Sequence, residues 1–227
     1  MKKKRIKFYA SLWALDPWDI QDYVKAFEET GTDGLHFDIM DGHYVPNLAM
    51  GTDEATLWHS LTDIPLDFHI AAYNPEQLLE YYELKENDTV SFHPETCRHP
   101  YRLLQDLKKK GVKPGYALSP SVSLEWVREA LPVIEHIDFL TINPGFFGMP
   151  MVPNAIERLE RLRKICDEAD HPIEIVCDGS IIPEHGKLYV AAGADGLVAG
   201  PSTLEKEGPC AYARRMKEYC EEVGIEH

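Results

Sequence analysis

Eight short runs of apolar and β-branched residues recur along the chain, and longer amphipathic stretches separate them. These strand-like runs cover residues 6–11, 34–39, 65–71, 88–92, 112–118, 137–142, 173–177 and 195–199. Because parallel strands are joined by crossover helices, this alternation is typical of βαβ units and a parallel sheet. The chain has 227 residues, a length that suits an eightfold barrel, so we predict one α/β domain over residues 1–227 with a (β/α)8 TIM barrel fold.

The helical stretches have recognisable ends. Helices are expected over residues 17–30, 100–110, 153–168, 183–192 and 208–223. In the first of them, Asp16 is a typical N-cap, Pro17 suits the first helical position, and Gly31 follows the last turn. A doubly wound open sheet is the alternative for the same alternation, although no G-x-G-x-x-G sequence follows the first strand to support a dinucleotide site.

The charge and cysteine content exclude several classes of protein. The formal net charge of −15 repels nucleic acid phosphate and anionic lipid. No apolar run approaches the roughly 18 residues that a membrane span needs. The five cysteines form no C-x-x-C pair, which argues against a zinc ribbon or a disulfide framework. We therefore expect a reduced, cytoplasmic enzyme that acts on a small molecule and binds neither nucleic acid nor membrane.

Ionisable residues lie in or just after several of the strand-like runs, where (β/α) barrels carry their chemistry. His36 and Asp38 alternate in the second run and so share one face of it, His69 lies in the third, and Asp178 follows the seventh. Burying two imidazoles and two carboxylates without partners would be costly, and a divalent cation would satisfy all of them. We predict these four residues as ligands of one cation, with Zn, Fe, Mn, Co or Mg as candidates.

Glycine-containing turns follow the last three predicted strands. Their backbone N–H groups could bind an anion, as late loops of barrels often do, and no cluster of basic side chains lies near them in the sequence. The alternative is that the glycines only make tight turns. The predicted substrate-binding residues of these turns are Gly145, Phe146, Phe147, Gly148, Gly179, Ser180, Gly200 and Ser202.

The segment HFDIMDGHYVPN at residues 36–47 closely resembles the signature of the ribulose-phosphate 3-epimerase family, and weaker motifs follow in the family's order along almost the whole chain. The resemblance implies a (β/α) barrel that inverts C3 of a ketose phosphate with a divalent metal, and a homo-oligomer, dimer or hexamer. It implies that Ser11, Met40 and His69 contact the substrate. The four ligands predicted above match the family's metal ligands, and Asp38 and Asp178 match its acid and base.

Some positions depart from the family pattern. HPET at 93–96 and DGS at 178–180 are more similar to the branch acting on allulose 6-phosphate than to the pentose enzymes. Phe147 adds bulk where the family has a small residue, and Pro201 removes one N–H donor. Ribulose 5-phosphate, allulose 6-phosphate and a ketose without phosphate therefore all stay open as substrates.

Two aspartates on distant strands suit an epimerisation. One would remove the weakly acidic proton at C3, and the other would return a proton to the opposite face of a cis-enediolate stabilised by the cation. The sequence disfavours two other functions. A sugar-phosphate decarboxylase barrel is disfavoured because no D-x-K-x-x-D motif is present, and a non-catalytic sugar-phosphate binder is disfavoured because it would not need both Asp38 and Asp178.

Overall fold

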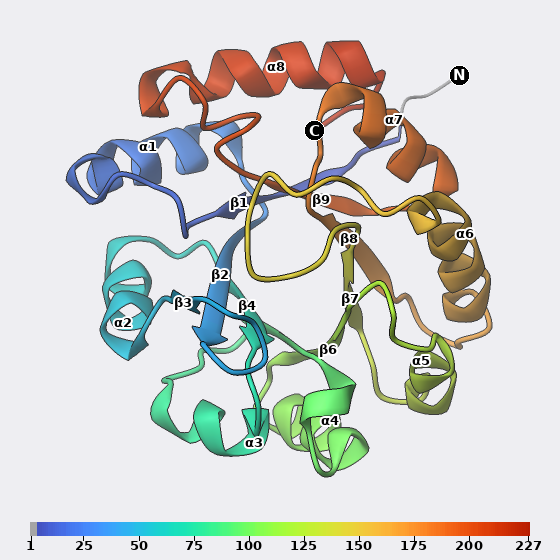
Figure 1. The fold of residues 1–227 in the computed structure, drawn as a ribbon. Helices are drawn as coiled ribbons and strands as arrows, with labels where there is room; N and C mark the ends of the chain where they lie inside the picture. The colour runs from blue at the N-terminus through green and yellow to red at the C-terminus, as the bar shows by residue number, and fades with distance from the viewer. Residues whose placement is uncertain (1–3) are drawn as a thin grey trace.

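The computed structural model describes residues 4–227, and its centre is a barrel of eight parallel strands (Figure 1). Strand β1 pairs in parallel with both β9 and β2, which closes the sheet into a ring. This closure confirms the predicted (β/α)8 barrel and excludes the open sheet. Every predicted strand is present, with ends within two residues of the prediction. The barrel strands are Lys7–Ser11 (β1), Gly34–Asp41 (β2), Leu66–Ala71 (β4), Thr89–Phe92 (β5), Lys113–Leu118 (β6), His136–Leu140 (β7), Glu174–Asp178 (β8) and Gly196–Ala199 (β9).

Helices surround the barrel on its outer side (Figure 1). They are Ile20–Thr30 (α1), Thr52–Leu61 (α2), Pro75–Leu78 (α3), Pro100–Lys109 (α4), Glu125–Ala130 (α5), Ala155–Cys166 (α6), Pro183–Ala192 (α7) and Tyr212–Val223 (α8). The Asp16 side chain accepts a hydrogen bond from the Trp18 N–H and so caps a short 3₁₀ helix, Pro17–Asp19, that precedes α1 where one continuous helix from residue 17 was predicted. Gly31 ends α1 in the left-handed conformation, as predicted. The prediction did not include α2, α3 and α5, because α3 and α5 are very short and α2 buries only Ala55 and Trp58.

A short strand, Leu48–Ala49 (β3), was also not predicted. It pairs antiparallel with the end of β2, where Gly42 adopts φ 71° and donates its N–H to the Asn47 carbonyl. The Asp41 carboxylate accepts hydrogen bonds from the backbone N–H groups of His43 and Tyr44. This hairpin fixes residues 42–47 beside the open end of the barrel.

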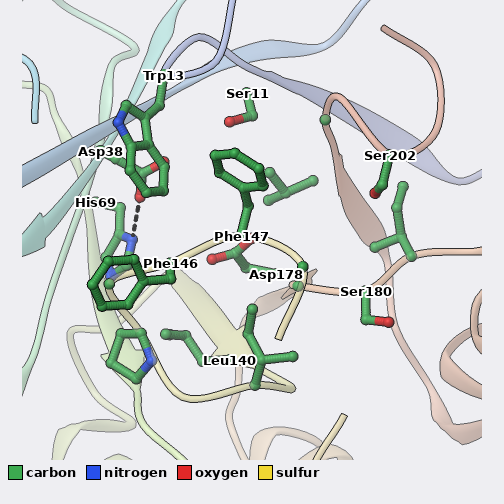
Figure 2. Close-up of a pocket in the computed structure, with 18 of the residues that line it drawn as sticks. Ser11, Trp13, Asp38, His69, Leu140, Phe146, Phe147, Asp178, Ser180 and Ser202 are labelled. Atoms are coloured by element: carbon green, nitrogen blue, oxygen red, sulfur yellow. Dashed lines mark hydrogen bonds and ion pairs between the residues drawn. The ribbon is translucent and has the colours of Figure 1, made fainter. Parts of the chain in front are cut away.

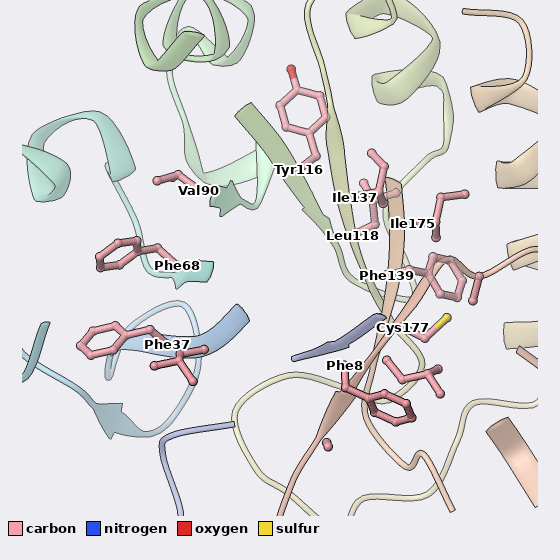
Figure 3. Packing of buried hydrophobic residues seen from close by; sticks show 14 of the residues in the cluster. Phe8, Phe37, Phe68, Val90, Tyr116, Leu118, Ile137, Phe139, Ile175 and Cys177 are labelled. Carbon is pink, nitrogen blue, oxygen red and sulfur yellow. The ribbon is translucent and has the colours of Figure 1, made fainter. Parts of the chain in front are cut away.

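The side chains that the barrel strands direct outward are apolar, whereas the inward ones include both apolar and polar residues. The outward residues pack against the helices as one large core (Figure 3), which includes Phe8, Phe37, Phe68, Val90, Tyr116, Ile137, Phe139, Ile175 and Cys177. The inward positions alternate with them and carry most of the ionisable groups of the site. Within residues 4–227, no helix is both long and apolar enough to cross a membrane.

Candidate active site

A pocket lies at the C-terminal ends of the strands, and Figure 2 shows side chains that surround it. The structure brings every predicted substrate-contacting residue to this pocket. Those residues are Ser11, Met40, His69, Gly145, Phe146, Phe147, Gly148, Gly179, Ser180, Gly200 and Ser202. Asp38 and Asp178 also line it, whereas the fully buried His36 lies behind the pocket surface.

Three of the four predicted cation ligands lie together, whereas the fourth, Asp38, contacts two of them but is not in the group of described residues placed to share one cation. Ligand atoms of His36, His69, Asp178 and a further residue, Asp138, are all within 4.8 Å of one another. Oδ1 of Asp38 lies 2.9 Å from Nδ1 of His69 and 3.5 Å from Nε2 of His36. The sequence interpretation missed Asp138, although a signal was present, because a carboxylate stands inside the apolar run 137–142.

These residues fit a divalent cation. Nε2 of His36 and both carboxylate oxygens of Asp138 are buried, and no described residue hydrogen-bonds to them. Buried polar atoms are normally paired, so unpaired ones that converge on one point indicate a bound ion or water. Imidazole and carboxylate donors are the set that zinc, iron and manganese use in proteins. The group as a whole can therefore hold a metal ion.

The carboxylates of the pocket have different tendencies to hold a proton. Burial raises the pKa of Asp138 to about 7 and also raises the pKa of Asp178 above its ordinary value. Burial acts in the same direction on Asp38, but the neighbouring His36 and His69 outweigh it and hold the pKa of Asp38 well below its usual range. Asp38 is therefore the charged carboxylate, and Asp178 is the one that more readily carries a proton. Environments that separate two pKa values in this way mark acid and base roles.

A chain of hydrogen bonds leads from His69 to the exposed residue Glu95. Nε2 of His69 lies 3.0 Å from Nε2 of His93, whose Nδ1 lies 3.2 Å from Oγ of Ser119. The Ser119 hydroxyl is 2.8 Å from the Tyr44 hydroxyl, which donates to the Glu95 carboxylate at 2.7 Å. Burial and the nearby His69 hold the pKa of His93 well below its usual range, so His93 is neutral and one of its ring nitrogens is an acceptor. This chain fixes the orientation of the His69 ring.

A second polar layer lies deeper in the barrel. Asp67 is buried, its Oδ2 lies 2.9 Å from Nδ1 of His36, and its Oδ1 faces Nε2 of His136 at 3.8 Å. Further from the pocket, the Glu174 carboxylate accepts a hydrogen bond from the Tyr9 hydroxyl at 2.8 Å and pairs with Lys7 at 3.0 Å. The barrel interior therefore supports the His36 ligand with a carboxylate.

An aromatic pair covers one side of the pocket. The rings of Trp13 and Phe147 meet edge to face with centroids 5.5 Å apart. The loop that carries Phe147 joins β7 to α6 and curves across the open end of the barrel (Figure 1), and Nδ2 of Asn47 donates to the Gly145 carbonyl in it at 2.9 Å. Gly145 has φ 106°, and a Cβ added there would meet Val45 at 3.0 Å, so this position requires glycine.

The opposite end of the pocket consists of small residues. Gly179, Ser180, Gly200 and Ser202 line it together with Pro201. None of the residues that line the pocket is lysine or arginine. Any anion bound at this end would therefore rely on hydroxyl and backbone N–H groups.

The comparisons with known proteins agree with this geometry. A model of the ribulose-phosphate 3 epimerase family matches residues 7–204. A ribulose-phosphate 3-epimerase of Methanocaldococcus jannaschii is 32% identical over 94% of this chain and 90% of its own, and one of Bacillus subtilis is 31% identical over 86% and 90%. The tryptophan synthase alpha-subunit of Pyrococcus furiosus superposes with a TM-score of 0.66 at 15% identity, over 99% of this chain and 100% of its own, and so shares the fold. The chain therefore belongs to the ribulose-phosphate 3-epimerase family and is an epimerase acting on carbohydrates.

Proposed function

We propose that this protein is a divalent-metal-dependent 3-epimerase of a ketose phosphate. The substrate pair is D-ribulose 5-phosphate with D-xylulose 5-phosphate, or D-allulose 6-phosphate with D-fructose 6-phosphate. The observation that carries the proposal is the pair Asp38 and Asp178, which line one pocket together with His69. They lie on β2 and β8, which strands β1 and β9 separate in the closed sheet.

The two aspartates divide the proton transfer between them. The hydrogen at C3 is weakly acidic because it lies α to the C2 carbonyl. The ionised Asp38 takes this proton on one face, and a proton from Asp178 reaches C3 on the other, which inverts the centre. In the reverse direction the two residues exchange roles. A single base would tend to return the proton to the face it came from, so both carboxylates are needed.

A divalent cation bound by His36, Asp38, His69 and Asp178 would polarise the carbonyl and offset the charge of the enediolate. The remaining walls of the pocket keep that charge away from water. Met40, Leu140 and Ile142 provide a non-acidic lining, and Trp13 with Phe147 covers it from outside.

The phosphate of the substrate is assigned to the small-residue end of the pocket, where Gly179, Ser180, Gly200 and Ser202 offer donors. Pro201 and the lack of a basic residue in the lining favour a second candidate, a ketose without phosphate. The two candidates differ in one measurable quantity, because a phosphate requirement appears as a large difference in kcat/KM between a ketose phosphate and its free sugar.

The test is the exchange of the C3 hydrogen with solvent deuterium, followed by NMR for pentulose and hexulose phosphates and their free sugars. With the preferred substrate, Asp38→Asn and Asp178→Asn should each lower interconversion by about 10²–10⁴-fold, the usual contribution of a general acid or base. Each variant should also exchange the C3 hydrogen of only one of the two epimers. The epimer that still exchanges should differ between the two variants.

The metal content of each variant serves as the control, because both aspartates are also proposed ligands. Turnover near the wild-type rate in either variant would contradict the two-base scheme. Exchange from the same epimer in both variants would contradict the assignment of the two residues to opposite faces.

A further inference from the structure

We propose that Asp138 is a fifth protein ligand of the cation. The inference rests on the proposed function only in that a divalent cation occupies this site, and it adds a carboxylate that the family resemblance does not supply. The full set of donors would be His36, Asp38, His69, Asp138 and Asp178.

The position of Asp138 follows from the register of the sheet. Asp138 lies on β7, where it pairs with Ala117 of β6 and Val176 of β8, and it alternates along β7 with the outward-packed Ile137 and Phe139. Its side chain therefore points into the barrel. The next inward residue of β7 toward the pocket is Leu140, which lines it. Asp138 thus lies directly below the pocket floor.

The distances suit a shared cation. Oδ2 of Asp138 lies 3.6 Å from Nδ1 of His69, and its ligand atom is within 4.8 Å of those of His36, His69 and Asp178. Two ligands held at about 2.2 Å from one cation lie at most about 4.4 Å apart. Shifts of a few tenths of an ångström are therefore enough to bring these atoms into one coordination shell.

A second and independent observation is that the buried Asp138 carboxylate lacks hydrogen-bond partners. Its side chain is 1% exposed, and neither carboxylate oxygen has a hydrogen-bond partner among the described residues. A buried carboxylate that has an ion-pair contact with His69 but no hydrogen bond is costly, and a cation at this point would satisfy it.

A fifth donor changes the chemistry of the site. Three carboxylates and two neutral imidazoles carry a formal charge of −3, which attracts a dication strongly. Oxygen-rich sites suit manganese better than zinc, and structural zinc sites are almost always four-coordinate. The proposal therefore implies a site that binds Mn²⁺ well and has more than four protein donors.

The test measures metal binding to the metal-free protein, not turnover. Mn²⁺ is titrated calorimetrically into the wild type, Asp138→Asn and a matched control, Glu205→Gln. Glu205 is also a buried carboxylate, 6% exposed and without partners for either oxygen, but it does not line the pocket. Asp138→Asn should raise the Kd for Mn²⁺ by at least 10–100-fold, the loss that even outer-sphere partners of ligands cause, and Glu205→Gln should not change it.

The absorption of bound Co²⁺ gives a second readout, and its first part needs only the wild type. Visible bands of Co²⁺ are intense with four ligands and weaken as further ligands are added. Wild-type protein should show the weak bands, and Asp138→Asn, if folded by circular dichroism, should show stronger ones. Intense four-coordinate bands in the wild type, or an unchanged Kd in Asp138→Asn, would overturn the proposal. Because no substrate is present, these outcomes are separate from a failure of the proposed epimerase activity.

Discussion

Nδ1 of His36 donates a hydrogen bond to Oδ2 of Asp67 across 2.9 Å, and both side chains are buried. The Asp67 pKa is held below its usual range despite burial, chiefly by this hydrogen bond, so Asp67 is a charged acceptor. An imidazole that donates from Nδ1 to a carboxylate presents a fixed, more basic Nε2 on its other side. Here that Nε2 faces the proposed cation site.

Replacing Asp67 should therefore weaken metal binding without removing a ligand. We expect Asp67→Asn to raise the Kd for Mn²⁺ by about 10–100-fold, because the neutral amide no longer fixes the tautomer and basicity of His36. Calorimetric titration of the metal-free protein measures this change. The far-ultraviolet circular dichroism spectrum checks that the barrel is intact. An unchanged Kd in a folded variant would show that His36 does not need this carboxylate.

The chain from His69 through His93 and Ser119 to Tyr44 should behave as one unit. Tyr44→Phe and Ser119→Ala each remove hydroxyl hydrogen bonds at 2.7–2.8 Å, and each should lower the free energy of unfolding by about 1–2 kcal/mol. Because the two hydroxyls contact each other, the double variant should lose less than the sum of the single losses. Urea unfolding of the four proteins measures this coupling, and strictly additive losses would contradict it.

Removal of the metal should lower both activity and thermal stability. A cation present at about 100 times its Kd stabilises the folded state by about 2.7 kcal/mol. For a chain of this length, about 1 kcal/mol corresponds to 2–4 °C, so chelation should lower the Tm by about 5–10 °C. Calorimetric scans and turnover assays before chelation, after chelation and after addition of Mn²⁺ check this expectation. Unchanged Tm and turnover after complete removal would contradict metal dependence.

The buried Glu205 should make stability fall as the pH rises. Burial raises its pKa well above the ordinary value of 4.5, so the folded protein binds its proton more tightly than the unfolded chain does. The contribution of protonated Glu205 to the free energy of unfolding is therefore fully present below about pH 4.5, and it is lost as the pH rises through the folded-state pKa. Glu205→Gln removes this dependence, so the variant should gain stability over the wild type as the pH increases.

Urea unfolding of both proteins at a series of pH values from 4 to 9 would measure this difference. A difference between Glu205→Gln and the wild type that does not change with pH would show that Glu205 is charged in the folded protein.

The fold could be predicted from the sequence because each of the eight barrel strands has its own apolar run, which marks it as a buried parallel strand. The helices α2, α3 and α5 escaped prediction for local reasons. The amphipathic pattern needs several turns to become visible, and α3 has four residues and α5 six. The hairpin containing β3 depends on Gly42 and on Asp41, whose pattern predicts a turn but not the strand that follows it.

The site was predictable where side chains lie near strand ends, and less so elsewhere. Asp138 lies in the middle of β7, so a prediction based on the ends of strands did not include it. The contact between Tyr44 and Ser119 joins residues 75 positions apart, which no local pattern encodes. The roles of Asp38 and Asp178, the metal, the exact ketose, the oligomeric state and the cytoplasmic location stay predictions.

The hydrogen bond from Asn47 to the Gly145 carbonyl joins two segments that are 98 positions apart. One end of the loop that carries Phe147 is thereby tied to the hairpin after β2. Gly148, which follows Phe147, has open space around it and φ 75°. If this loop moved, it would rotate about its hydrogen bond to Asn47, and the part near Gly148 would move furthest. Substitutions within residues 44–47 would then alter the rate at which sugars enter and leave, even though none of those residues lines the pocket.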